Sequence, residues 1–263
     1  MKRSSGVRLC ATAVVSVLSL ALVTGCAETP KDAGDGGGKD AASPAAEAPS
    51  AAELKKLIIA EGEVPGYKVG AVEGGLPTKD QVTSGDARCE PVLRALTGVA
   101  PGDPAATTSR MATQAKKAPA AGTPSGDDLA DGKFADALHK SMDVDVTVVT
   151  LASYDGDGAQ RALTSVSDAV KACADGFSGR QDGEKGRFTK VAEEKSSGTG
   201  DASVAFTASN DTGEDGALPL HAEVVRHGAT LATYTTINIG AMMGKKPYTV
   251  SAPVVKAQAA KLK

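Results

Sequence analysis

The chain has 263 residues, of which 41% are hydrophobic, 3% are aromatic and 23% are charged, with a formal net charge of −3 at pH 7. Lys and Arg form no cluster of the kind that neutralises a run of phosphates, so we expect no nucleic-acid partner. The absence of Trp disfavours a carbohydrate-stacking surface, although the Tyr and Phe residues leave that alternative open.

The first 25 residues have the features of an export signal. Residues 9–23 form an apolar run that follows three basic residues, Lys2, Arg3 and Arg8. This length is typical of a signal-peptide core and is shorter than the about 20 residues of a membrane-spanning helix. The run ends in LVTGC at residues 22–26, which resembles the lipobox of bacterial lipoproteins.

The lipobox resemblance implies cleavage before Cys26 and attachment of a diacylglyceryl group to its thiol. Two or more acyl chains hold a protein stably on a membrane, so we expect a permanent anchor in the cell membrane with the protein on its extracytoplasmic face. Cleavage by an ordinary signal peptidase and retention of an uncleaved anchor are the alternatives.

The chain divides into three parts. Residues 1–25 are the predicted signal peptide. Residues 26–50 form a lipidated linker that is rich in Gly, Ala, Pro, Ser and Asp, and without large apolar residues it should be disordered. Its root-mean-square reach is about 25–30 Å. Residues 51–263 are long enough to bury a full core and form the predicted folded domain.

Two cysteines remain for the folded domain, because Cys10 lies in the signal and Cys26 carries the lipid. Cys89 shares the apolar stripe of a helix that begins at Asp86 and stops near Gly98. Cys173 ends the stripe of a second helix, capped by Asp157 with Gln160 at the capping-box position, and Gly176 follows as its C-terminal cap. In an oxidising compartment such a pair favours one disulfide between two helices.

Two further helices are predicted at the ends of the domain. Ser50 and Glu53 form a capping-box pattern before a short helix over residues 51–60. Ser251 caps the last helix, with Pro253 in its first turn and an apolar stripe of Val255, Ala259 and Leu262. A brief helix is also expected over residues 134–142.

Strands fill most of the remainder. The clearest alternates Val144, Val146 and Val148 with polar residues and continues to Tyr154. Strand-like composition also marks residues 67–72, 107–117, 187–193, 203–208, 218–226 and 230–238, with a tight hairpin at His227-Gly228. Residues 73–86 and 118–133 are predicted loops, and residues 240–247 a flexible or lid-like loop. The predicted fold class is α+β, a single antiparallel sheet with helices packed on one face.

Several short motifs occur together in an order that resembles one family. They are EVPGY at residues 63–67, the helix with Cys89 and Pro91, LASY at 151–154 before the helix ending in Cys173, VVRHG at 224–228, and the terminal helix. They look like lipoproteins of high-GC Gram-positive bacteria whose domain is similar to the extracellular sensor domain of PknH-type serine/threonine kinases. The resemblance implies an antiparallel sheet with disulfide-pinned helices, a surface cleft and a ligand-sensing role. Those sensors carry two disulfides, whereas this chain can form one.

No residue pattern identifies a catalytic or metal site. The histidines are His139, His221 and His227, and no G-x-S-x-G nucleophile elbow accompanies them. His221 and His227 are expected in structural roles on a hairpin. Residues 155–158, DGDG, begin like a calcium loop but lack the later ligands, so they are expected to form a turn. We expect no catalytic residue, no metal and no cofactor, and the ligand-binding residues stay unassigned.

Two functional hypotheses of different class follow. The first is a non-enzymatic sensor or binding module of the cell envelope that presents a cleft to an envelope ligand or a partner protein. The second is a carrier of an apolar envelope ligand such as a lipid, which requires a cavity lined by aliphatic side chains. An unrecognised hydrolase and a purely structural wall protein are further alternatives.

Overall fold

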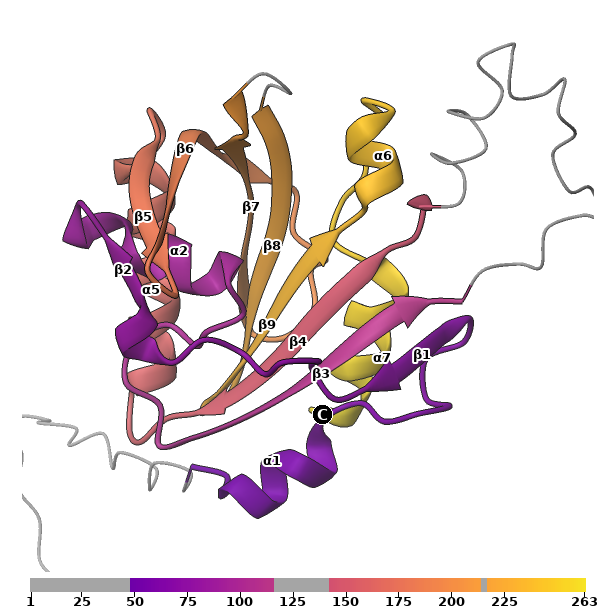
Figure 1. Ribbon diagram of the computed structural model, residues 1–263. Helices are drawn as coiled ribbons and strands as arrows, with labels where there is room; N and C mark the ends of the chain where they lie inside the picture. The colour runs from indigo at the N-terminus through magenta and orange to yellow at the C-terminus, as the bar shows by residue number, and fades with distance from the viewer. Residues whose placement is uncertain (1–47, 116–141, 214–216) are drawn as a thin grey trace, which may run out of the picture. The chain divides into compact units, whose positions relative to one another are not determined.

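The computed structural model describes residues 48–115, 142–213 and 217–263. These residues form one antiparallel sheet of nine strands in the order β1-β3-β4-β9-β8-β7-β6-β5-β2 (Figure 1). The predicted class, α+β with a single antiparallel sheet, is confirmed. The signal peptide, Cys26, nearly all of the linker, the loop at 118–133 and most of the helix at 134–142 lie outside the described residues.

In the second half of the chain the strands follow the predicted ones closely, except that residues 177–181 form an additional strand. Their bounds are β1 (Tyr67–Gly70), β2 (Val82–Ser84), β3 (Ala106–Gln114), β4 (Val146–Ser153), β5 (Phe177–Gln181), β6 (Glu184–Glu194), β7 (Ala202–Asp211), β8 (Ala217–His227) and β9 (Thr230–Ile237). Gly228, with φ of +58°, makes the tight turn between β8 and β9, as predicted.

The helices lie near the ends of the domain and between groups of strands. Their bounds are α1 (Ala51–Leu57), α2 (Glu90–Leu96), α5 (Gly158–Ala172), α6 (Ile239–Met243) and α7 (Ala252–Lys261), with short 3-10 turns at Lys79–Gln81 and Ala87–Cys89. The capping box of Ser50 and Glu53 is present at the start of α1. None of the helices among the described residues has the length and apolar content that crossing a membrane requires.

The helices cover both faces of the sheet, so the prediction of helices on one face is wrong. Val224 in β8 belongs to a core with α2 and α5, whereas the next residue, Val225, belongs to a core with α1 and α7. Successive side chains of a strand point to opposite faces, so each central strand contributes to both cores. We call these the α5 face and the α7 face of the sheet; α7 passes behind β3 and β4 in Figure 1.

A disulfide holds the helices of the α5 face together. Cys89 and Cys173 are joined with their Cα atoms 5.9 Å apart, across 84 residues of sequence. Both cysteines are buried in the core between α2 and α5. The predicted helix-to-helix pairing is therefore the one that the structure contains.

A buried glutamine holds the helices of the α7 face together. Gln258 in α7 accepts a hydrogen bond from the Ile59 amide at 2.9 Å. Its side-chain amide donates to the Leu57 carbonyl, also at 2.9 Å. Leu57 is the last residue of α1, and Gln258 is fully buried. A single side chain of α7 therefore supplies hydrogen-bond partners to the backbone at the C-terminal end of α1.

Four local predictions are corrected. The predicted loop at 73–86 contains β2, and β5 follows Gly176, because Val82↔Gln181 and its neighbours pair over long sequence separation. Asp157 does not cap α5 through its side chain, since its carboxylate pairs with Arg161. The predicted loop at 240–247 begins within the short helix α6.

Candidate functional site

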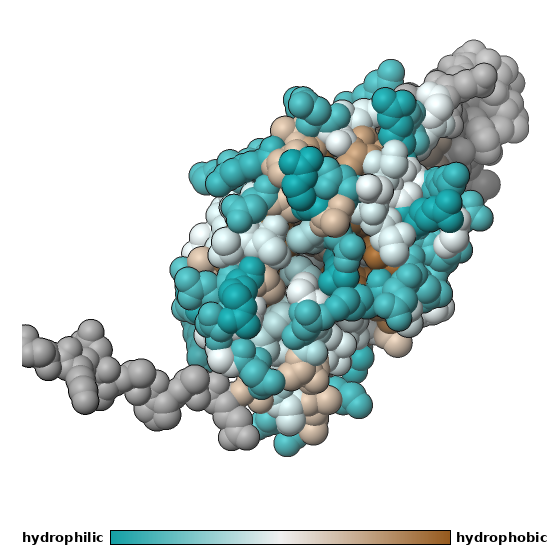
Figure 2. Space-filling model, turned by 90° about the vertical axis from the view of Figure 1, so that its left-hand side faces the viewer, coloured by the Kyte–Doolittle hydropathy of each residue, from teal (hydrophilic) through white to brown (hydrophobic). Residues whose placement is uncertain are grey.

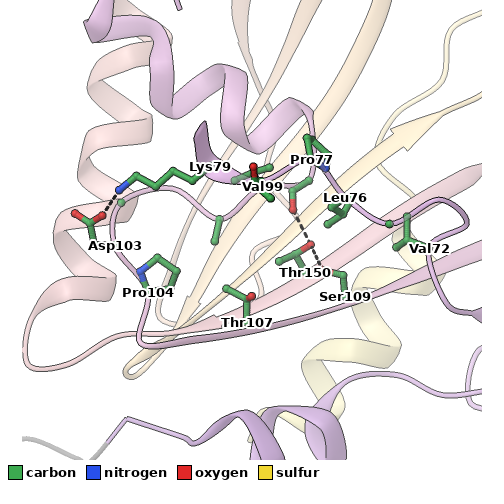
Figure 3. Close-up of a pocket in the computed structure, with 15 residues that line it drawn as sticks. Val72, Leu76, Pro77, Lys79, Val99, Asp103, Pro104, Thr107, Ser109 and Thr150 are labelled. Atoms are coloured by element: carbon green, nitrogen blue, oxygen red, sulfur yellow. Dashed lines mark hydrogen bonds and ion pairs between the residues drawn. The ribbon is translucent and has the colours of Figure 1, made fainter. Parts of the chain in front are cut away.

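The α5 face is only partly covered, and two hollows open beside α2. The first, which we call the loop pocket, has a volume of about 630 Å³. Its floor is made by Thr107 and Ser109 of β3 and Thr150 of β4, and its walls by the chain segments 72–79 and 98–104 (Figure 3). The walls are mainly apolar, with Val72, Leu76, Pro77, Val99 and Pro104.

Hydroxyl groups are the main polar side chains on the floor. Thr150 donates to the Gly98 carbonyl at 2.8 Å, so the 2.8 Å contact between the Ser109 and Thr150 hydroxyls has Ser109 as donor. In Figure 3 this chain of hydrogen bonds runs from the floor up to the 98–104 segment. The floor therefore keeps hydroxyl acceptors available beside apolar walls.

The 98–104 wall is fixed from behind by buried side chains. Tyr154 donates to the Pro101 carbonyl at 2.6 Å, and burial raises the pKa of this phenol, so it stays a donor. Arg94 of α2 donates to the Gly102 carbonyl at 3.2 Å. A wall held at several carbonyls by α2 and β4 is preorganised for a ligand.

The two walls meet through one ion pair at the pocket mouth, Lys79 with Asp103 (Figure 3). The hydrogen bond from the Lys79 ammonium holds the pKa of Asp103 below its ordinary value. Both side chains are strongly exposed, at 48% and 87%, so this contact adds little stability. It is a bridge that a ligand can displace at small cost.

The second hollow, which we call the hairpin groove, has a volume of about 520 Å³. Apolar side chains from four strands and α2 form most of its surface: Val146, Val148, Phe188, Leu220, Ile237, Leu93 and Leu96. Charged side chains at the tip of the β5–β6 hairpin form one rim: Arg180, Asp182, Glu184 and Lys185. Ile237 is 36% exposed, so apolar surface is accessible from solvent.

The β5–β6 hairpin is positioned by close packing against α2. A Cβ atom on Gly179 would lie 2.7 Å from a methyl group of Leu93, so a larger residue there would force the Leu93 side chain to shift. Phe177 and Phe188 stack with their ring centroids 4.7 Å apart at the base of the hairpin. The disulfide of Cys89 then fixes α2 itself to α5. The β5–β6 hairpin, which forms one side of the groove, is therefore held against the core through α2.

Gly98 lies where the two hollows meet, because it lines both. Its φ is +74°, and a Cβ atom there would lie 3.1 Å from Val148 and 3.2 Å from Leu76. The backbone conformation therefore favours glycine, and a larger residue would also press on these two side chains. The hollows together offer apolar surface, hydroxyl groups and a charged rim on one side of the sheet.

The histidines lie elsewhere. His221 is buried on the α7 face, where its Nδ1 lies 2.9 Å from a Glu194 oxygen and its ring meets the edge of Tyr248. His227 lies near the β8–β9 turn, and His139 is outside the described residues. The expected structural roles of His221 and His227 agree with these positions. Within the part of the chain that the structure describes, His, Cys, Asp and Glu form no group that could hold a metal ion.

The carboxylate of Glu223, on the same strand as His221, is also hydrogen-bonded within the protein. It is 3% exposed and accepts hydrogen bonds from the Ser197 amide and hydroxyl, both at 2.7 Å. The hydroxyl of Ser197 is thus directed to a carboxylate, and no histidine activates it. In neither hollow do the lining residues include a histidine or a cysteine.

Of the predicted site residues, the structure brings Cys89 and Cys173 together and does not describe Cys26. No hollow-lining residue was predicted from the sequence. One signal was present: Thr150 and Val148 stand on the strongest predicted strand and point to the same face. Which segments lie over that face depends on pairings between distant parts of the chain.

The fold and the hollows define a structural class: a single-sheet α+β domain with one partly uncovered face. No known protein-family model matches the chain, and no curated protein matches it. Among solved structures it is similar to the extracellular domain of PknH from Mycobacterium tuberculosis, with 10% identity and a TM-score of 0.46. The match covers 82% of this chain and 95% of that one. This is the kinase type that the short motifs resemble, and at this similarity no residue role is carried over.

Proposed function

We propose that this chain is a lipoprotein anchored through Cys26 at the extracytoplasmic face of the membrane, and that its folded part is a non-enzymatic binding module. The observation that carries the binding role is the pair of hollows on the α5 face, which meet at Gly98. They expose apolar side chains and hydroxyl groups while the candidate acids and bases of the α7 face are engaged within the protein.

The chemistry of the hollows indicates the class of ligand. The hairpin groove offers an apolar floor with a charged rim, and the loop pocket offers hydroxyl groups between apolar walls. An amphipathic envelope component, or an apolar side chain of a partner protein with polar groups around it, meets both requirements. We favour a binding or sensing role over catalysis for this reason.

The anchoring half of the proposal has its own test. The Cys26→Ala variant of the full chain should leave the membrane fraction, because the lipid is the proposed anchor. The matched control is Cys10→Ala, which changes a cysteine inside the export signal and should leave the protein membrane-bound. If Cys26→Ala stays wholly with the membrane, lipidation of that thiol is not the anchor.

The binding half is tested on protein purified from its own envelope. Ile237→Asp places a charge on the groove floor, whereas Ile239→Asp does so at an isoleucine that is 54% exposed and does not line either hollow. Native mass spectrometry and pull-down should show a ligand or partner that the first variant loses and the second retains. Equal retention by both variants contradicts the proposed site.

A carrier of an apolar envelope ligand is the second candidate, because the hairpin groove has an aliphatic floor. Lipid extraction distinguishes it from the sensor. A carrier should hold copurified lipid at a near-stoichiometric level, and Ile237→Asp should remove that lipid. A sensor or partner-binding module should yield a protein partner, or a ligand that is only substoichiometric.

A further inference from the structure

A third hollow lies at the far end of the sheet and shares Arg180 and Lys185 of the β5–β6 hairpin with the hairpin groove. It has a volume of about 690 Å³ and is lined by residues of β2, β5 and β6 and of the segment that follows β7. We call it the cationic pocket, because Arg180, Lys185 and Arg187 line it. Figure 2 views the molecule from the side of Figure 1 where β2 and β5 lie, and hydrophilic residues cover most of that side.

The strand register brings the cations together. Arg180 of β5 lies directly opposite Lys185 of β6, and Arg187 lies opposite Ser178. Phe177 and Phe188 are buried on the α5 face. Arg180 is three residues from Phe177, and Lys185 and Arg187 are three residues and one residue from Phe188, so by strand alternation these three side chains project from the opposite face. On β2, Thr83 lies opposite Arg180 and adds a hydroxyl group to the same row.

Among the described residues, these three cations have no partner of opposite charge. Within the described ranges, none of them makes an ion pair or a side-chain hydrogen bond. Like charges directly opposite each other across two strands are destabilising. The pocket lining contains one carboxylate, Asp211, against the three cations. This concentration occurs in a chain whose formal net charge is negative.

The pocket also lets a small anion approach the backbone. Four glycines line it: Gly85, Gly179, Gly186 and Gly213. The Ser178 and Thr83 side chains supply hydroxyl donors beside the cations. Arg and Lys together with hydroxyl groups are what recognises a phosphate group, since charge-assisted hydrogen bonds to its oxygens are stronger than neutral ones.

We propose that the cationic pocket binds the phosphate group of an anionic envelope molecule, and that Arg180, Lys185 and Arg187 supply the counter-charge. The cationic pocket borders the proposed ligand site, because Arg180 and Lys185 also stand on the rim of the hairpin groove, whereas Arg187 lines the cationic pocket and neither of the other two hollows. The phosphate can belong to a soluble phosphorylated molecule or to a lipid headgroup, and the experiment distinguishes these sources.

The experiment follows glycine amide signals by NMR in the full chain, held in an uncharged detergent. Inorganic phosphate and glycerol 3-phosphate are titrated at constant ionic strength, with chloride as the reference anion. We expect saturable shifts of Gly85, Gly179, Gly186 and Gly213, and no such shift of Gly70 on β1. A soluble phosphorylated ligand gives these shifts with glycerol 3-phosphate, whereas a lipid headgroup gives them when phosphatidylglycerol, but not phosphatidylcholine, is added to the micelles.

The variant that removes the charges is Arg180→Gln/Lys185→Gln/Arg187→Gln. We expect it to weaken phosphate binding by about tenfold or more, since even one lost charge-assisted hydrogen bond amounts to that factor. The matched control, Lys55→Gln/Lys56→Gln/Lys68→Gln, removes the same charge from three exposed lysines outside the pocket.

Three results overturn the proposal. In the first, the triple variant and its control weaken phosphate binding equally. In the second, chloride shifts the glycine signals as much as phosphate does. In the third, neither phosphate nor phosphatidylglycerol shifts the signals of the pocket glycines. Ile237 lines the hairpin groove and not the cationic pocket, so Ile237→Asp should leave the phosphate-dependent shifts of Gly85 and Gly213 unchanged even if it abolishes binding on the α5 face.

Discussion

The two faces of the sheet are closed in different ways. On the α7 face, the first and last helices of the domain lie against the central strands and are joined by Gln258. On the α5 face, α2 and α5 are joined by a disulfide but leave two hollows beside α2. The comparison indicates that buried polar groups of the α7 face hold its helices together, and that the larger hollows open on the α5 face.

The largest expected effect on stability comes from removing the disulfide of the α5 face. Replacing both Cys89 and Cys173 by Ala should lower the free energy of unfolding by about 4–5 kcal/mol, because the disulfide closes a long loop in the unfolded chain. Urea unfolding of the oxidised protein and the variant measures this difference. Reducing agent should destabilise the parent and leave the variant unchanged, and equal stability of parent and variant would contradict the disulfide's role.

Removing the Gln258 side chain of the α7 face should reduce stability by a smaller amount. Gln258→Ala removes two hydrogen bonds and leaves the Ile59 amide buried without its partner, so we expect a loss of about 2–4 kcal/mol. The control is Gln160→Ala on the exposed side of α5, which should change stability by less than about 0.5 kcal/mol. Thermal unfolding separates the two, and ligand binding on the α5 face should be the same in both. If Gln258→Ala and Gln160→Ala change stability by the same small amount, Gln258 does not hold α1 to α7.

A smaller effect is expected at the junction of the two hollows. Gly98→Ala should cost about 1–2 kcal/mol, because an L side chain is disfavoured at positive φ and its methyl group would press on Val148 and Leu76. Gly70→Ala is the matched control, since its φ is not positive and no atom lies within 4 Å of the added carbon. Gly98→Ala should also weaken ligand binding. If both variants are equally stable, the junction is not constrained as described.

The smallest effect concerns pH and belongs to the α7 face. Burial lowers the pKa of His227 below its ordinary value, against the opposing charge of Asp201. As the pH falls below about 6.5, the unfolded chain takes up this proton before the folded protein does, so stability decreases. His227→Gln should flatten the decrease between pH 8 and pH 5. An unchanged slope would show that His227 does not set it.

Local signals predicted the elements that depend on neighbouring residues. The capping pair Ser50 and Glu53 marked α1, and alternating valines marked β4. The spacing of Cys89 and Cys173 along apolar helix stripes led to the correct disulfide. Each of these features is decided within a few turns or one strand, so the sequence contains enough information to predict it.

Elements that depend on distant partners were missed. β2 has three residues, and its partner β5 contains Ser178 and Gly179, which are weak strand formers. A helix stripe also shows which side of the helix is buried and not which face of the sheet it covers, so helices were expected on one face. The hollows combine residues from many segments, and only the sheet order brings them together.

Photo-crosslinking at Ile237 tests the central claim most directly. A photoreactive residue there lies on the floor of the hairpin groove, and one at Lys68 lies on the exposed side of the edge strand β1. After irradiation in the native envelope, mass spectrometry should find a defined adduct at position 237 and none at position 68. No adduct at 237, or the same adduct at both positions, would contradict a ligand site on the uncovered α5 face.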